Sequence, residues 1–443
     1  MEKMFSKQDL KKLILPLMIE QVLLVAVGMA DTIMISRVGE AAVSGVSLVD
    51  TINILLINIF TALATGGAVV AGHCLGGGQP ERASEASEQL MLFSGAVSLG
   101  IMVLVLAGHT WILNHVFGQI EPEVMEDARI YLLITALSIP FIAIYNGGAA
   151  IFRAMSDAKT SMKVSLIMNG VNIAGNAILI YGFGRGVEGA AIPTLVSRML
   201  AAGIVVALLR NQNLEIHLPL KIQLRFHRDM IRKICFIGIP NGLENSVFQL
   251  GKILVLSLVA SFGTAAIAAN AVANSIASFQ VIPGAAIGYA IVTVVSQCAG
   301  AKRYDEAKYY TRQLMKYMYI GMWAVNILVI FTCPLIVRAY HLSAGTGALT
   351  TKLLIYHAVG CMTIWNIAFG LPNALRAAGD VKMTLVISLL SMWIFRIGFS
   401  FLLGENLKWG VFGIWVAMTI DWLFRAILFQ IRYHRGKWQE IEF

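Results

Sequence analysis

The sequence predicts an all-α integral membrane protein with twelve transmembrane helices, arranged as two parallel, pseudo-symmetric bundles of six. Three observations predict this fold class: the composition, a series of long apolar stretches, and an internal repeat. Of the 443 residues, 58% are hydrophobic and only 13% are charged, and the mean hydropathy is +0.74. Because soluble domains carry about 25% charged residues, this composition excludes an ordinary soluble protein.

Twelve stretches are long and apolar enough to cross a bilayer, which takes about 20 residues of α-helix. They are residues 13–36, 47–74, 90–113, 129–152, 160–182, 187–209, 231–260, 267–298, 314–337, 352–375, 383–403 and 410–431. The second, seventh and eighth stretches exceed the minimum length, so we expect tilt or turns outside the membrane there.

The distribution of basic residues predicts the orientation of these helices. With the N-terminus in the cytoplasm, the inner segments hold 24 Lys and Arg residues and the outer loops hold 6. We therefore expect both termini to lie in the cytoplasm. We also expect a multi-pass protein of the inner (plasma) membrane that is monomeric and contacts membrane lipids. The net charge of +9 follows from this topology, and we expect no nucleic-acid partner.

An internal repeat divides the chain into two halves. A shift of 224 residues aligns GEAAVSGVSLVDTI with GTAAIAANAVANSI, and HCLGGGQPERA with QCAGAKRYDEA. The same shift places Pro16 on Pro240 and Glu20 on Glu244. Each half holds six spans, an even number, so the two halves run in the same direction through the membrane. Parallel repeats of this kind are typical of transporters.

The repeat predicts domains at residues 1–212 and 230–443, joined by a cytoplasmic linker at residues 213–229. The linker alternates apolar and polar positions around Pro219, which predicts an extended strap rather than a helix. The sequence contains no metal-ligand run, nucleophile motif or phosphate-binding loop, and its five cysteines lack metal spacing. We therefore expect neither an enzyme nor a cofactor.

Two carboxylates interrupt the first apolar stretch. Glu20 and Asp31 are eleven residues apart, which brings them within about 20° of the same face of a helix. Ionisable residues inside a membrane are costly, so they are functional hypotheses by default. Two acids on one face suggest a shared polar cavity. The alternative is that each acid is buried in the bundle and held by hydroxyls or by a basic partner.

Polar residues recur in the fifth and seventh spans. Asn169, Asn172 and Asn176 occupy one helical face, where they either form a site or hold helices together. Glu244 of the second half corresponds to Glu20 of the first half, and a pair of acids, one from each half, favours a cationic substrate. The alternative for Glu244 is an ion pair, for which Lys252 is an available cation in the same helix.

Four segments resemble the multidrug and toxic-compound extrusion (MATE) family of cation-coupled exporters. They are MADTIMISRVGEAAVSGVS, RAMSDAKTSMKVSLIMNGVNIAGNAILIYG, GIPNGLENSV and LRAAGDVKMTLV, and the resemblance covers essentially the whole chain. It implies a V-shaped fold and secondary active efflux of amphiphilic organic cations or drugs, by antiport with H⁺ or Na⁺ and alternating access. The alternatives are an exporter of a specific metabolite or lipid-linked molecule, and a non-transporting membrane receptor or scaffold.

The resemblance also implies a coupling site. Asp31, Asn172, Asn176 and Thr194 match the positions that bind the coupling cation in similar family members. Their oxygens are hard ligands suited to Na⁺, with Asp31 as the expected metal ligand, while the same carboxylate in a dry pocket can instead bind a proton. This chain departs from many relatives, which carry aspartate in place of Asn176 and a small residue in place of Pro193. The choice between H⁺ and Na⁺ stays open.

Two further sets of residues complete the predicted transport machinery. The residues expected to line the substrate cavity are Glu20, Glu244, Asn169, Asn270, Asn274, Gln280, Tyr289 and Trp365. Pro16 and Gly28 give the first helix places to bend, because proline removes a backbone hydrogen bond and glycine removes steric restraint.

Overall fold

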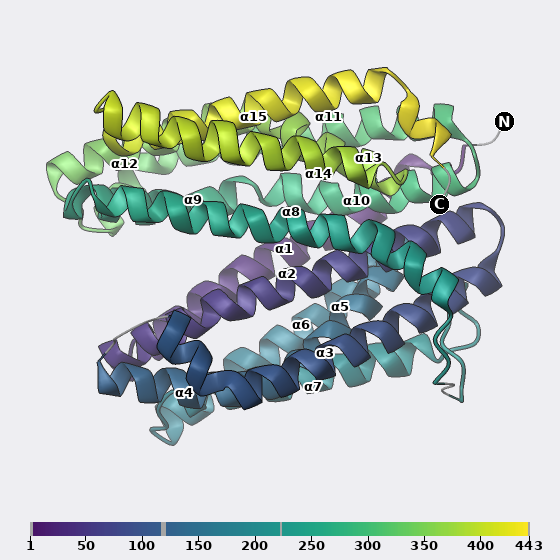
Figure 1. The fold of residues 1–443 in the computed structure, drawn as a ribbon, viewed down its shortest axis with the longest axis horizontal. Helices are drawn as coiled ribbons and strands as arrows, with labels where there is room; N and C mark the ends of the chain where they lie inside the picture. The colour runs from purple at the N-terminus through teal and green to yellow at the C-terminus, as the bar shows by residue number, and fades with distance from the viewer. Residues whose placement is uncertain (1–2, 117–120, 222–223, 442–443) are drawn as a thin grey trace. The chain divides into compact units, whose positions relative to one another are not determined.

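The computed structural model describes residues 3–116, 121–221 and 224–441, and these residues form helices and connecting segments without a β-strand. The elements of the first half are α1 (Lys7–Ile35), α2 (Glu40–Gly76), α3 (Pro80–Val116), α4 (Pro122–Leu137), α5 (Ile139–Ala154), α6 (Ala158–Asn176), the π-helix η1 (Ala177–Gly182) and α7 (Glu188–Leu209). Figure 1 shows these elements in purple to teal.

The second half repeats this order with more interruptions. Its elements are α8 (Arg228–Ala260), α9 (Thr264–Gln280), α10 (Ile282–Gly300), α11 (Tyr304–Ala339), α12 (Ala344–Gly360), the π-helix η2 (Cys361–Gly370), α13 (Leu371–Ala377), α14 (Val381–Leu390), the π-helices η3 (Ser391–Gly398) and η4 (Ser400–Asn406), α15 (Gly410–His434) and the 3₁₀-helix η5 (Lys437–Glu440). They run from teal to yellow in Figure 1.

The number of spans agrees with the prediction. Among the described residues, eleven helices are long and apolar enough to cross a membrane, and the bent pair α4 and α5 supplies a twelfth. The bend of 48° lies at Ser138, directly before the first turn of α5. That turn contains Pro140, which lacks a backbone N–H and is tolerated at this position of a helix. The all-α membrane fold with twelve spans is therefore confirmed.

The structure departs from the repeat at one helix of the second half. The stretch at residues 267–298 was expected to form one helix, but it is broken into α9 and α10 at Val281, whereas α2 is continuous. Pro283 stands in the first turn of α10, and the corresponding residue of α2 is Ile59. Because proline cannot donate the helical hydrogen bond that the isoleucine can, the break occurs in one half only.

The chain forms two compact units, which consist of residues 1–21 with 243–443 and of residues 22–242. These units differ from the predicted domains at the starts of α1 and α8. Before α1, the backbone of Phe5 exchanges two hydrogen bonds with the hydroxyl of Tyr310 on α11. At the start of α8, the carbonyl of Ile234 lies so close to Gly66 of α2 that a Cβ there would be 2.5 Å away. These contacts join each helix start to the other half of the repeat.

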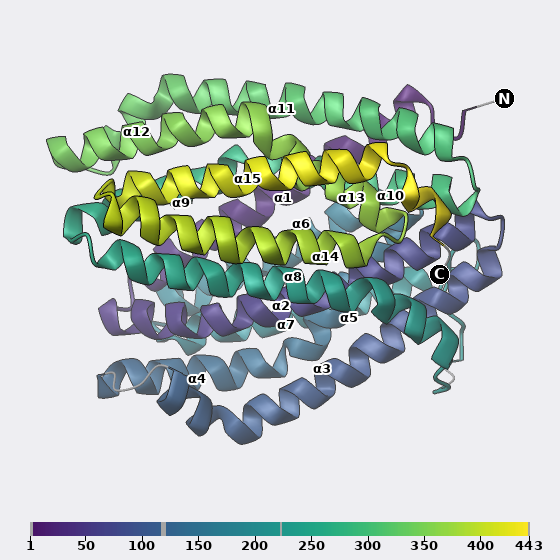
Figure 2. The same ribbon diagram turned by 45° about the horizontal axis from the view of Figure 1, so that its top comes forward.

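A central helix organises each unit. In the unit of residues 22–242, α2 contacts α3, α4 and α5, as Figures 1 and 2 show. In the other unit, α10 is buried along most of its length and contacts α11 and α13. Small residues allow this packing, since Gly67 of α2 lies against Leu90 of α3 without room for a Cβ.

The linker lies on the unit of residues 22–242. Of the predicted linker, residues 213–221 and 224–227 form neither helix nor strand, which agrees with the predicted strap, whereas residues 228–229 already belong to α8. Ile216 is fully buried, and the backbone N–H of His217 donates to the hydroxyl of Ser84 on α3. Gln89 of α3 holds the end of the linker through hydrogen bonds with the backbone of Arg225 and His227.

Candidate functional site

The four residues of the predicted coupling site form one hydrogen-bond chain. The amide of Asn176 donates to the carboxylate of Asp31 at 2.7 Å and lies 3.4 Å from the amide oxygen of Asn172. Asn172 donates to the hydroxyl of Thr194 at 3.0 Å, and Thr194 donates to the carbonyl of Ala190 at 2.9 Å. The chain therefore connects α1, α6 and α7.

Local sequence explains this geometry. Asn172 and Asn176 are four residues apart and share one face of α6, which ends at Asn176, where the π-helix η1 begins. π-Helical turns are frequent at functional sites. On α7, Pro193 precedes Thr194, and a Cβ on Gly175 of α6 would lie 2.7 Å from the proline ring. Gly175 thus makes room for the larger residue that this chain has at position 193.

One polar atom of the coupling site has no partner. The amide oxygen of Asn176 is buried and accepts no hydrogen bond in the described part of the chain. A buried acceptor without a partner is uncommon and calls for a physical reason. The Asp31 carboxylate, one hydrogen bond away, is only half-buried. An accessible carboxylate beside an unused amide oxygen can bind a small cation, because both atoms are hard oxygen ligands.

A second polar group borders Asp31. Asp50 of α2 interacts electrostatically with Asp31, accepts a hydrogen bond from the hydroxyl of Tyr131 on α4, and attracts Arg198 of α7. The guanidinium of Arg198 also donates to the hydroxyl of Ser138 at 2.8 Å. Neither Asp50 nor Arg198 was among the residues predicted for the coupling site. Their meeting depends on how α2, α4 and α7 pack.

In the other unit, Glu244 is neutralised by arginines. The guanidinium of Arg376 donates to both carboxylate oxygens at 2.9 Å, the hydroxyl of Ser388 donates at 2.6 Å, and Arg425 lies 3.8 Å away. Glu244 is only 8% exposed. The structure therefore gives Glu244 an ion pair, but with Arg376 and Arg425 rather than with Lys252. Its repeat mate Glu20 is buried in the same compact unit.

Three of the remaining predicted cavity residues are buried and bonded within their bundles. Asn169 donates to the hydroxyl of Ser165, Asn270 accepts from the indole N–H of Trp415 at 3.0 Å, and Gln280 lies 2.7 Å from a ring nitrogen of His357. Gln280 is fully buried, so contact with a ligand would require the bundle to open.

The other three predicted cavity residues are more accessible. Asn274 is exposed, while Tyr289 and Trp365 are half-buried. Trp365 stacks on Phe369 with ring centroids 5.0 Å apart, and Phe369 packs edge-to-face against Phe248. This aromatic group joins η2 to α8 within one unit.

The two predicted hinge residues lie within a continuous helix, since α1 is helical from Lys7 to Ile35. Pro16 is buried, whereas Gly28 is exposed and has open space around it. A larger side chain at position 28 therefore meets no obstacle in this structure.

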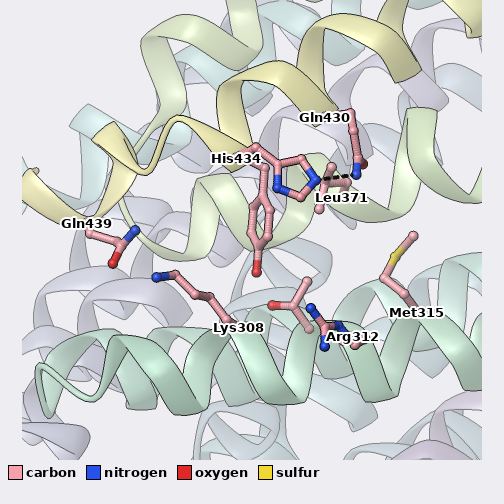
Figure 3. Close-up of a pocket in the computed structure, with 9 residues that line it drawn as sticks. Lys308, Arg312, Met315, Leu371, Gln430, His434 and Gln439 are labelled. Carbon is pink, nitrogen blue, oxygen red and sulfur yellow. Dashed lines mark hydrogen bonds between the residues drawn. The ribbon is translucent and has the colours of Figure 1, made fainter.

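A cavity that the sequence did not predict opens between the start of α11 and the end of α15. Figure 3 shows it, with Lys308 and Arg312 of α11 facing His434 and Gln439. Its volume is about 380 Å³, and Gln430 and His434 are hydrogen-bonded at 2.7 Å on its wall. Its residues come from distant parts of the sequence, which is why no local pattern indicated it.

Comparisons with known proteins identify the family. The family model MatE matches residues 16–178 and again residues 240–402, two matches offset by the 224 residues of the predicted repeat. The uncharacterized transporter YisQ of Bacillus subtilis is 29% identical, with 96% of this chain and 93% of YisQ covered. The probable multidrug resistance protein NorM of Thermotoga maritima is 24% identical, with 98% and 93% covered.

Solved structures show the same fold. The crystal structure of MATE in the bent conformation has a TM-score of 0.89 at 19% sequence identity, with 98% of this chain and 96% of that chain covered. The outward-facing conformation of a multidrug resistance MATE family transporter has a TM-score of 0.88 at 19% identity, with 98% and 97% covered. Together with the double family match, these results show that the chain belongs to the MatE family of membrane transporters.

Proposed function

We propose that this protein is a secondary active exporter, which couples efflux of small amphiphilic organic molecules to cation entry at Asp31. One observation carries this proposal: the unused amide oxygen of Asn176 lies in the same hydrogen-bond chain as the accessible Asp31 carboxylate. Family membership favours a transporter over an enzyme or a scaffold, and relatives such as NorM of Thermotoga maritima are named probable multidrug resistance proteins.

The coupling step depends on the link between α1 and the end of α6. With no cation bound, Asp31 accepts the 2.7 Å hydrogen bond from Asn176. When Asp31 takes up Na⁺ or a proton, its charge is offset and this hydrogen bond is replaced or weakened. Loading therefore changes the energy of the α1–α6 contact. A ligand shifts a conformational equilibrium only by its differential affinity for the two states, and this contact supplies such a difference.

The proposed substrates are amphiphilic organic cations and drugs, as the resemblance to the family implies. The paired acids Glu20 and Glu244 lend this less support than the sequence suggested, because Arg376 and Arg425 already offset the charge of Glu244. Export of a specific metabolite stays the alternative. We further propose alternating access in the plasma membrane, with both termini cytoplasmic and the protein monomeric.

Reconstituted vesicles test the coupling proposal. The purified protein and its Asp31→Asn variant are placed in liposomes, and efflux of ethidium is followed under an imposed pH gradient and then under an imposed Na⁺ gradient. We expect one of the two gradients to drive efflux by the wild type and neither to drive it in Asp31→Asn. Glu40→Gln, which removes an exposed acid at the start of α2, is the matched control. Undiminished gradient-driven efflux by Asp31→Asn would refute the proposal.

A further inference from the structure

Cations gather around one aromatic ring in the unit of residues 1–21 and 243–443. The Lys252 ammonium lies 4.9 Å from the ring centroid of Phe248, and the guanidinium carbons of Arg396 and Arg425 lie 5.6 and 5.7 Å from it. Arg376 joins this group through Glu244, which contacts both Arg376 and Arg425. We call these four cations and Phe248 the Phe248 cluster.

Two carboxylates in contact with the Phe248 cluster are already engaged. Glu244 accepts two hydrogen bonds from Arg376. Asp421 accepts one from Arg425 at 3.0 Å, and another from the hydroxyl of Ser391. Four cations thus meet two carboxylates, so the cations of the cluster outnumber the acids that contact them.

Arg396 and Lys252 hold hydrogen-bond donors that remain unused in the described part of this cluster. Arg396 is only 8% exposed, yet two of its nitrogens, Nε and Nη1, have no hydrogen-bond partner in the described residues. Its Nη1 lies 3.9 Å from Oδ2 of Asp421, so the two charges form an ion pair, but the distance is too long for a hydrogen bond. Lys252 is exposed on α8 and contacts the face of Phe248. A cation–π contact leaves all three ammonium donors available to a ligand.

Uncompensated cations in the middle of a membrane helix are costly, and they usually face a water-filled cavity or a partner of opposite charge. The repeat does not account for Lys252, because the corresponding residue of the first half is Gly28. Likewise, Asp31 corresponds to Val255. Each half of the repeat therefore has an ionisable residue that the other half lacks, and the two residues, of opposite charge, lie three positions apart in the alignment of α1 with α8.

We infer that Lys252 and Arg396 form a binding site for an anionic group, such as a carboxylate, on the transported molecule. Lys252 is accessible and meets the anion first, while Arg396 lies deeper and offers two unused donors. Phe248 and the stacked pair of Trp365 and Phe369 supply an aromatic surface beside these charges. The inferred substrates are aromatic amphiphilic cations that also carry an anionic group, that is, zwitterions. This inference rests on the proposed export function, whose substrate class it narrows.

Dye binding tests the inference without any ion gradient. Rhodamine B carries a free carboxylate, and its methyl ester is the same dye with that charge removed. Binding of both dyes to the full-length protein in phosphatidylcholine nanodiscs is measured by fluorescence polarisation. We expect the wild type to prefer rhodamine B, and Lys252→Met to weaken binding of rhodamine B by about tenfold while leaving the ester unchanged, since one charge-assisted bond is lost.

Matched variants separate this site from a general effect. Lys352→Met removes another exposed lysine of the same unit, which lies over the ring of Phe412, and should change neither dye. Lys252→Arg keeps the charge and should keep the preference. No preference for rhodamine B in the wild type, or an equal loss for both dyes in Lys252→Met, would overturn the inference. So would loss of the preference in phosphatidylglycerol nanodiscs, because a lipid headgroup of net negative charge would then be the anion bound.

The two proposals fail in different ways. Asp31→Asn is expected to keep the dye preference, because Asp31 belongs to the other compact unit and the assay contains no gradient. Gradient-independent efflux with an intact dye preference would refute coupling alone. Gradient-driven efflux without that preference would refute the anion site alone.

Discussion

Glu244→Gln decides between a structural and a substrate-contacting role for this carboxylate. The substitution keeps the shape of the side chain but removes its charge. Arg376 then faces a neutral amide in place of two carboxylate oxygens at 2.9 Å, and Arg425 loses one of its two carboxylate neighbours. Because Glu244 is 8% exposed, little water is available to replace the lost interactions.

The expected cost follows from this burial. Removing one partner of a buried ion pair destabilises a protein by about 3–5 kcal/mol. Arg425 keeps its 3.0 Å bond to Asp421, so we expect the lower end, about 3 kcal/mol. For a unit of this size, 1 kcal/mol shifts the midpoint of thermal unfolding by roughly 2–4 °C, so the midpoint should fall by about 10 °C.

Thermal unfolding in detergent, followed by tryptophan fluorescence, measures this shift. Glu405→Gln, which neutralises an exposed glutamate of the same unit, should leave the midpoint within about 1 °C, because exposed charges contribute little to stability. The double variant Glu244→Gln/Arg376→Met should recover part of the loss, since it removes both members of the pair. A wild-type midpoint combined with lost dye binding would refute the structural role and favour substrate contact.

Two further predictions concern the other compact unit. Gly66→Ala places a Cβ 2.5 Å from the carbonyl of Ile234, and we expect it to lower the free energy of unfolding by about 2 kcal/mol. The control Gly95→Ala, at a glycine with open space around it, should be neutral or slightly stabilising. Equal unfolding midpoints for these two variants would contradict the packing of α2 against α8. Asn176→Asp brings a second carboxylate to Asp31, and two adjacent carboxylates need a cation or a proton between them. Where the vesicle assay identifies Na⁺ as the coupling ion, stabilisation by Na⁺ in thermal-shift titrations should appear at concentrations about tenfold lower than in the wild type, and an unchanged titration would contradict the proposed ligand role of position 176.

The sequence predicted much of the coupling site because that part depends on helical periodicity. Asn172 and Asn176 share a face of one helix whatever surrounds it, and the family resemblance linked them to Asp31 and Thr194. The structure places these four side chains in one hydrogen-bond chain. It adds Asp50, which was not among the predicted site residues and lies on a different helix from Asp31.

The partners of Glu244 could not be predicted in the same way. Arg376 lies 132 residues further along the chain, and the pairing depends on how α8 and α13 pack. The sequence offered Lys252, two turns away in the same helix, because local spacing is the only geometry it provides. In the structure, Lys252 contacts Phe248 instead. Because Glu244 pairs with arginines, Lys252 is available to the inferred anion site.

The sequence by itself determined the membrane class, the twelve spans and the parallel repeat, because hydrophobic length and a constant 224-residue shift are properties of the chain alone. Only the tertiary structure decided which ionisable groups neutralise one another. The free energy of a buried charge depends on the distance to its nearest opposite charge, and that distance is set by helices far apart in sequence. For this reason Glu244 and Asp31, which looked alike as intramembrane acids, differ in the structure: Glu244 is paired with arginines, and Asp31 stays accessible beside an unused oxygen.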